Sequence, residues 1–140
     1  MLLALIALSA LVGIGWPEGW MPYMAAVSFA LMLLGLALLV AGSIGLGSAL
    51  TPFPRPRERA SLMEGGVYAR ARHPIYGGAI LLAAGWTLIF ASVVGAVFTA
   101  LLVVFFELKA RREEAWLRER YPEYAEYARR TRRHFVPWVY

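Results

Sequence analysis

The stretch IYGGAILLAAGWTLIFASVVGAVFTALLVVFFEL, residues 75–108, carries no charged side chain before Glu107. As one helix it would be about 50 Å long, far more than the ~30 Å of a bilayer's hydrocarbon core. Divided at FASVVG, residues 90–95, it gives two helices of about 26 Å each, which begin and end on the same side of the membrane. We therefore predict a helical hairpin with spans at residues 75–91 and 93–108.

The composition of the whole chain is typical of a membrane protein. The chain has 140 residues, which suggests a single domain over residues 1–140, and 60% of them are hydrophobic. Only 16% are charged, whereas about 25% are charged in an ordinary soluble domain. The chain has no cysteine and only two histidines, so neither a thiolate metal site nor a histidine-rich one is expected.

The charges are distributed unevenly along the chain. All 14 Lys and Arg residues lie between Arg55 and Arg133, and Glu18 is the only charge before them. Basic residues beside membrane-length apolar runs are typical of cytoplasmic loops, so we do not expect nucleic-acid binding. The connection at residues 51–74 and the tail at residues 109–140 are therefore predicted to be cytoplasmic.

Two more apolar runs precede the hairpin, at residues 2–15 and 21–50. The first has no basic N-terminal region and is soon followed by the second, so we interpret it as a retained span rather than a signal peptide. The tail is predicted to be helical, with Pro122 ending one segment and opening the next. The fold expected is an all-α integral membrane protein with about four transmembrane helices, both termini in the cytoplasm, and a cytoplasmic helical tail.

The predicted hairpin brings two polar segments together at the cytoplasmic surface. They are EGGVYARARHPIYGG, residues 64–78, and ELKARREEAWLRERY, residues 107–121. The first offers glycines and arginines, the second offers Glu113 and Glu114, and both offer aromatic rings. A ligand with an amino acid end, an aromatic base and a positive centre would suit this mixture, because carboxylates pair with ammonium groups and rings face cations.

Simpler roles are open for each of these residues alone. The arginines before the hairpin could anchor a helix end by snorkelling to the interface, and Gly77 and Gly78 could serve helix packing. The pair Glu113–Glu114 could be a solvated face that pairs with Arg111 or Arg118 at helical spacing. Only their combination at the two ends of one hairpin indicates a site.

Both segments resemble a known family. GGVYARARHPIYGG resembles the G-x-Y…R-H-P-x-Y-x-G signature of the isoprenylcysteine carboxyl methyltransferase family, and residues 72–78 match it residue for residue. EEAWLRERYPEYAEYARR is similar to that family's E-E-x-x-L…Y-x-x-Y tail. Integral-membrane phospholipid N-methyltransferases are similar in the same two places. The resemblance covers residues 65–137.

The resemblance implies a membrane-embedded methyltransferase that uses S-adenosylmethionine and acts on a lipophilic acceptor. By motif, it assigns cofactor binding to one set of residues: Tyr68, His73, Tyr76, Gly78, Glu113 and Glu114. It assigns the acceptor's carboxylate to Arg130, which matches better than Arg129. Pro122 replaces the family's usual glycine and TRRHFVP replaces its usual Val-Pro, and both departures fall in the acceptor half.

The substrate follows less directly from the sequence. Carboxyl O-methylation of an isoprenylcysteine-like acceptor is our first reading, and it needs no base because the carboxylate is already ionised. Phospholipid ethanolamine N-methylation is the alternative, and it needs a base such as Glu113 or Glu126. An NADPH-dependent reductase of the sterol-reductase type and a non-catalytic membrane protein are the rivals of other classes. Membrane lipids are the expected surroundings, and the oligomeric state is left open.

Overall fold

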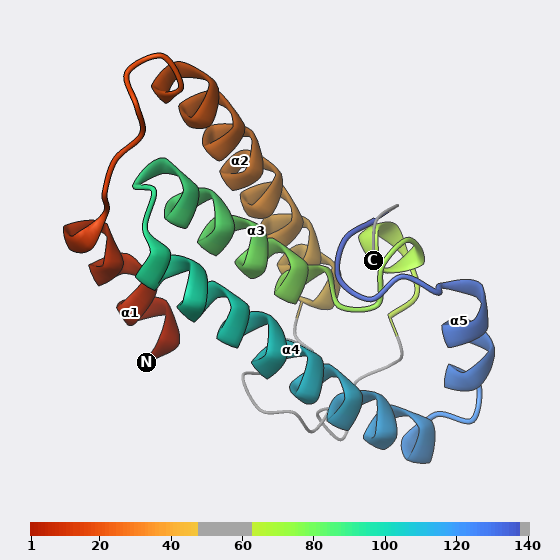
Figure 1. The fold of residues 1–140 in the computed structure, drawn as a ribbon. Coiled ribbons are helices and arrows are strands. Elements are labelled where there is room, and N and C mark those ends of the chain that lie inside the picture. The colour runs from red at the N-terminus through yellow and green to blue at the C-terminus, as the bar shows by residue number, and fades with distance from the viewer. Residues whose placement is uncertain (48–62, 138–140) are drawn as a thin grey trace. The chain divides into compact units, whose positions relative to one another are not determined.

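The computed structural model describes residues 1–47 and 63–137. In these two ranges it contains five α-helices, two short 3-10 helices and no strand, which confirms the all-α prediction (Figure 1). The end of the second predicted span, residues 48–50, and the first part of the predicted cytoplasmic connection, residues 51–62, lie outside the described residues.

The elements follow one another as α1 (Leu2–Leu8), η1 (Ser9–Val12), α2 (Met21–Leu46), η3 (Gly66–Ala69), α3 (Pro74–Ile89), α4 (Val93–Arg120) and α5 (Tyr124–Arg130). By length and composition, α2 and α4 could each cross a membrane, whereas α3 and the α1–η1 segment are apolar but shorter. An apolar helix is stable in lipid because its backbone groups hydrogen-bond to one another. Since only two of the described helices are long enough to span, the four-span arrangement and the position of the termini stay predictions.

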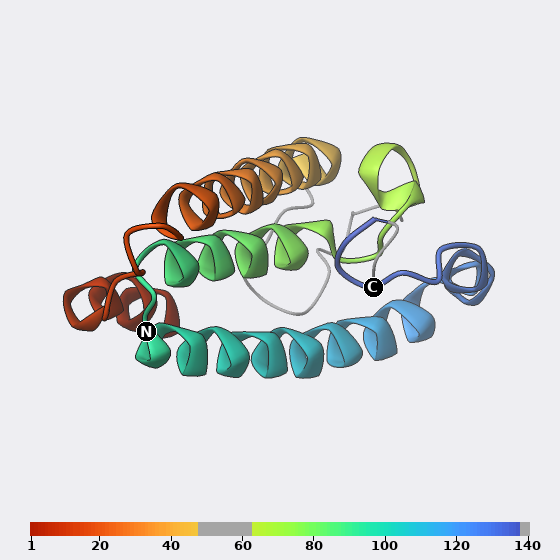
Figure 2. The same ribbon diagram turned by 45° about the horizontal axis from the view of Figure 1, so that its top comes forward.

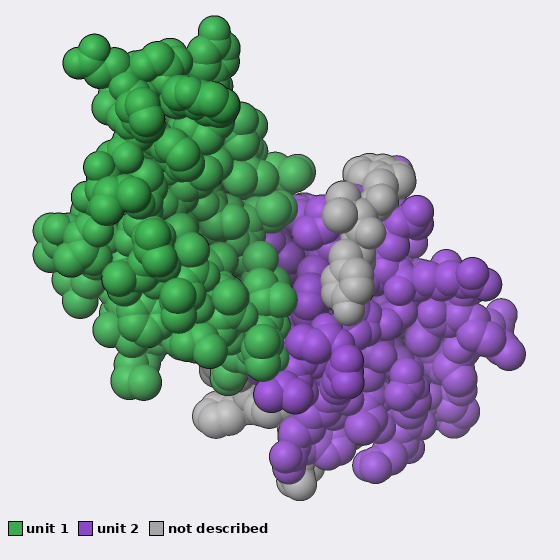
Figure 3. Space-filling view, in the orientation of Figure 1, with its two compact units in different colours: residues 1–37, 78–105 green, residues 38–77, 106–140 purple. Residues whose placement is uncertain are grey.

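The described chain divides into two compact units (Figure 3). Unit 1 consists of Met1–Ala37 and Gly78–Phe105, and unit 2 of Leu38–Gly77 and Phe106–Tyr140. The helices α2, α3 and α4 each contribute one part to each unit.

The hairpin turn lies in unit 1, between Ile89 and Val93, where the sequence predicts it. Ser92 caps α4, because its Oγ accepts a hydrogen bond from the Gly95 N–H at 3.1 Å, the usual contact of an N-cap serine. The Ser92 hydroxyl also donates to the Ser9 carbonyl at 2.9 Å. Figures 1 and 2 show α3 and α4 side by side as they leave the turn.

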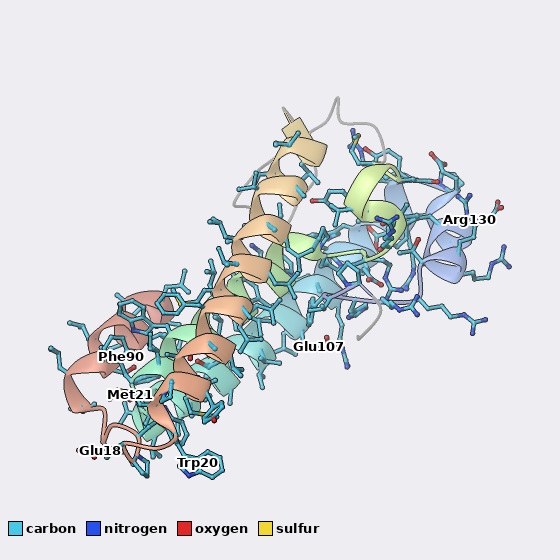
Figure 4. The ribbon with its side chains drawn as sticks, turned by 90° about the horizontal axis from the view of Figure 1, so that it is seen from above. Glu18, Trp20, Met21, Phe90, Glu107 and Arg130 are labelled. Atoms are coloured by element: carbon cyan, nitrogen blue, oxygen red, sulfur yellow. The ribbon has the colours of Figure 1, made fainter. Side chains whose placement is uncertain are left out.

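The N-terminal segment of unit 1 also contacts this turn. The Trp16 indole N–H donates to the Leu88 carbonyl at 2.6 Å, and Figure 4 shows Phe90 at the same end of the unit as Glu18. Residues 2–15 are not one continuous helix, because α1 gives way to η1, which ends at Val12. The first predicted span is therefore shorter in the structure than in the prediction.

Unit 2 is held together by its C-terminal residues. Residues 131–135, which we call the C-terminal strap, run beside the segment that enters α3. The Arg72 N–H donates to the Arg133 carbonyl at 3.0 Å, and the His73 N–H donates to the His134 carbonyl at 2.7 Å. A side chain at Gly77 would collide with the Phe135 carbonyl, so this glycine lets the two backbones meet.

Helix α4 is longer than the predicted span. It continues from Val93 to Arg120, so the predicted boundary between span and tail at residue 108 falls inside one helix. The break predicted at Pro122 is confirmed, since α4 ends before it and α5 begins at Tyr124. The continuous helix places Glu107, Glu113 and Glu114 on one rigid element.

Candidate functional site

A group of polar side chains in unit 2 lies where α4 faces the entrance of α3 and the C-terminal strap. Glu107 and Glu114 lie about two turns apart and so share one side of α4. We call these two residues and Glu113, with their partners, the carboxylate cluster. Its members come from three parts of the sequence, which only the fold brings together.

Glu114 is the most buried carboxylate of the cluster, with 4% of its surface exposed. Its Oε1 accepts a hydrogen bond from Arg72 Nε at 2.7 Å and lies 3.2 Å from His73 Nε2 and 3.1 Å from His134 Nε2. Its Oε2 accepts from Arg118 at 3.2 Å. Burying a charge is costly unless it is paired, and these partners meet that demand. The solvated-face interpretation is therefore wrong for Glu114, although its predicted pairing with Arg118 is present.

Arg72 ties α4 to the C-terminal strap. Besides Glu114, its guanidinium donates to the carbonyls of Thr131 at 2.7 Å and Arg132 at 3.2 Å. Only 11% of the Arg72 side chain is exposed. Arg72 is therefore part of an internal ion pair rather than a membrane anchor.

Glu113 has different surroundings from Glu114. The Tyr76 hydroxyl donates to Glu113 Oε1 at 2.6 Å, and His73 Nδ1 lies 3.6 Å from Glu113 Oε2. The Tyr76 ring stacks on Phe106 at 4.6 Å between centroids, and Lys109 Nζ lies 5.0 Å from the ring centre. Four of the predicted cofactor residues, His73, Tyr76, Glu113 and Glu114, thus belong to one cluster.

His134 is the member of the cluster that the sequence did not reveal. Its Nδ1 lies 3.2 Å from Glu107 Oε2 and its Nε2 lies 3.1 Å from Glu114 Oε1, so the ring bridges two carboxylates of α4. The hydrogen bond to Glu114 raises the pKa of His134 above its usual 6.5, against the opposing effects of burial and Arg72. The spacing of Glu107 and Glu114 places two carboxylates on one side of a helix, but it does not point to the histidine that bridges them.

Tyr68, another predicted cofactor residue, is buried and bonded within the framework. Its hydroxyl donates to the Gly42 carbonyl at 3.2 Å, and its own carbonyl accepts from the Tyr127 hydroxyl at 2.7 Å. Burial raises the pKa of both tyrosines well above 10, so both hydroxyls keep their protons and act as donors. The cofactor role of Tyr68 stays a prediction.

The two remaining predicted residues make contacts other than those of the cluster. Gly78 belongs to unit 1, where a Cβ on Gly35 of α2 would lie 2.7 Å from its carbonyl oxygen. Arg130 lies on α5, as labelled in Figure 4. Its side chain is 62% exposed and donates to Glu64 Oε2 at 2.6 Å. Gly78 therefore takes part in helix packing, and Arg130 holds a carboxylate at the protein surface.

A family model for phospholipid methyltransferases matches residues 23–124, which is more than half of the chain. The chain belongs to the phospholipid methyltransferase family. This family is part of the isoprenylcysteine carboxyl methyltransferase-like superfamily, so the resemblance seen in the sequence is confirmed at that level. Membership implies an integral-membrane methyltransferase that acts on lipid-like substrates, with S-adenosylmethionine as the implied methyl donor.

The matched range includes α2, α3 and α4, and with them His73, Tyr76, Glu113 and Glu114. Arg130 and His134 lie beyond it. No curated protein matches the chain.

Proposed function

We propose that the chain transfers the methyl group of S-adenosylmethionine to the amino headgroup of a membrane phospholipid. The observation that carries this proposal is the Tyr76–Glu113 hydrogen bond of 2.6 Å inside the range matched by the family model. The Glu113 carboxylate of this pair is sheltered and can serve as a base. An amine acceptor needs such a base, whereas a carboxylate acceptor does not. The amine of such a headgroup is protonated near neutral pH, and it must lose that proton before it can attack.

The residues of the cluster suit the methyl donor. When bound, S-adenosylmethionine supplies an electrophilic methyl group on a sulfonium. Glu114 matches its ammonium group, and Arg72 matches its carboxylate. Tyr76 already has the Lys109 ammonium 5.0 Å from its ring centre, so this ring is accessible to a cation. We assign donor binding to these residues together with His73, and we keep Tyr68 and Gly78 as the predicted contacts from the framework.

The two neighbouring glutamates receive different roles. Glu114 is surrounded by Arg72, His73, His134 and Arg118 and stays ionised, so it is suited to holding charge in place. Glu113 has a neutral donor at one oxygen and is suited to accepting the proton of the acceptor amine. The other base named from the sequence, Glu126, is exposed on α5 and is less suited to that task.

Carboxyl O-methylation is the second candidate, and the surface pair Arg130–Glu64 favours it. Arg130 holds a carboxylate at 2.6 Å, and an arginine that holds one carboxylate can orient that of an acceptor through a two-pronged contact. In that case Glu64 occupies the position of the substrate's carboxylate, and Arg130 rather than Glu113 is the residue on which turnover depends.

The experiment uses purified protein in vesicles with radiolabelled S-adenosylmethionine, and it offers phosphatidylethanolamine or a prenylated cysteine analogue. We expect label in the phospholipid, a loss of turnover of at least roughly 100-fold in Glu113→Gln, and equal turnover in Arg130→Lys and Arg132→Lys. Label in the prenylated cysteine alone, with Arg130→Lys selectively impaired, would replace the proposal by the second candidate.

A further inference from the structure

The structure assigns a positioning role to His134: its imidazolium fixes Glu114 and fastens the C-terminal strap to α4. The effect on methyl-donor binding rests on the proposed function, whereas the effect on the strap does not. His134 lies outside the range matched by the family model, so the inference concerns a feature that the family match does not cover.

The first support is the position of the ring between two carboxylates. With Nδ1 3.2 Å from Glu107 and Nε2 3.1 Å from Glu114, both ring nitrogens face an acceptor, and only the imidazolium can donate to both at once. The His134 side chain is 14% exposed, so little water is available to replace either partner. The geometry therefore favours the protonated ring.

The second support is the backbone beneath the ring. The His134 carbonyl accepts from the His73 N–H at 2.7 Å, and the Phe135 carbonyl lies against the Cα of Gly77. The same short segment thus contacts the entrance of α3 through its backbone and α4 through its side chain. Releasing His134 from the glutamates removes the side-chain half of this attachment.

The charged groups around His134 come from three segments. Helix α4 presents Glu107 and Glu114, the entrance of α3 presents Arg72 and His73, and the strap itself carries Arg133. Arg111 and Arg118 pair with the same two glutamates. The hydrogen bond to Glu114 raises the pKa of His134 above 6.5, although burial and Arg72 oppose it. The attachment is therefore strongest at neutral and mildly acidic pH and weakens as the pH rises.

Two measurements test the inference independently. The first is an NMR titration of the histidine side chains in micelles. It uses the native chain and two variants: His73→Gln, which serves only to assign the two signals, and Glu107→Gln, which removes one charged partner of His134. We expect the His134 signal to titrate above 6.5 in the native chain and closer to 6.5 in Glu107→Gln. A His134 signal that titrates at or below 6.5 in the native chain would overturn the inference.

The second measurement is binding of S-adenosylhomocysteine by calorimetry at about pH 6 and about pH 8.5, on either side of the usual histidine range. We expect the native affinity to fall roughly tenfold across this range, as for the loss of one charged hydrogen bond. His134→Gln should bind weakly at both values, and His134→Lys, which keeps a cation, should bind equally at both.

The matched control is Arg133→Gln, which removes one positive charge from the neighbouring exposed residue and should follow the native profile. A native profile in His134→Gln would overturn the positioning role. Absence of binding in the native chain at every pH would instead reject the proposed function, and the NMR titration would still decide whether His134 is held as an imidazolium.

Discussion

Glu113 and Glu114 are adjacent in sequence, yet their surroundings differ in kind. Glu114 is 4% exposed and meets two arginines and two histidines. Glu113 meets the neutral hydroxyl of Tyr76 at one oxygen and a single histidine, His73, at the other. A helix turns by about 100° per residue, so neighbouring side chains leave it in different directions. Two adjacent glutamates can therefore differ in role, with one carboxylate holding charges in place and the other able to accept a proton.

This difference predicts opposite outcomes for two similar substitutions. Glu114→Gln removes the charge that offsets Arg72 and its companions, and we expect a loss of about 3 kcal/mol in unfolding free energy, as for other broken buried pairs. Glu113→Gln keeps a hydrogen-bonding partner for Tyr76, and we expect a loss below about 1 kcal/mol. Unfolding in mixed micelles measures both. Equal losses would mean that the two carboxylates share one role.

His134 also predicts how stability depends on pH. Folding raises its pKa above 6.5 through the hydrogen bond to Glu114, so the folded state binds the proton more tightly than the unfolded state does. Its contribution is fully present below pH 6.5 and is lost as the pH rises through the folded pKa. Unfolding curves of the native chain and His134→Gln should differ most at mildly acidic pH and converge at alkaline pH. A gap that widens with pH would contradict this assignment.

At the scale of elements, the sequence was most informative where a local signal marks a helix end. Ser92 at the hairpin turn and Pro122 after α4 stop or start helices through their own chemistry, and both lie where they were expected. The predicted span ended at residue 108, where charged side chains begin. Helix α4 continues to Arg120, because charged side chains do not interrupt the backbone hydrogen bonds of a helix.

The partners inside the candidate site were predicted only in part. Tyr76 and Glu113 could be placed together from the hairpin geometry, because the two ends of a hairpin must meet. His134 could not, since nothing in the residues after α5 indicates that the chain returns to the entrance of α3. The need for glycine at position 77 could not be predicted either. It arises because the Phe135 carbonyl lies against Gly77, and the two segments are distant in sequence.

The meeting of strap and helix can be tested at Gly77. Gly77→Ala places a methyl group against the Phe135 carbonyl, where backbone rather than a flexible side chain must move. We expect a loss of about 1–3 kcal/mol in unfolding free energy, as is usual for overpacking, and weaker binding of S-adenosylhomocysteine. Gly65→Ala is the matched control, because its site is open and its φ of −91° suits any residue. A stabilised Gly77→Ala variant would show that the strap is not held there.

At the scale of the whole molecule, labelling can test how many helices cross the membrane and in which direction. Helices α2 and α4 meet the length criterion, and α3 does not. The absence of cysteine in the chain makes a clean labelling experiment possible. Single cysteines at Glu18 and Met63, both exposed, report on the two sides of α2.

We expect a membrane-impermeant maleimide to label Glu18→Cys in intact cells and Met63→Cys only after the cells are opened, because the basic residues follow α2. Comparable labelling at the two stages for both variants would indicate that α2 does not separate the two positions. The reverse pattern would place the carboxylate cluster on the outer face.

The C-terminal strap has a consequence for biosynthesis. A ribosome makes α4 before it makes the strap, so Glu114 leaves the exit tunnel before His134 can reach it. During that interval Arg72, His73 and Arg118, which are all made before the strap, are the side chains that can offset its charge. Formation of α4 and completion of the carboxylate cluster are therefore separate events, and a nascent chain arrested just after α5 would lack His134 in that cluster. The C-terminal strap, made after α5, determines when the carboxylate cluster is first complete.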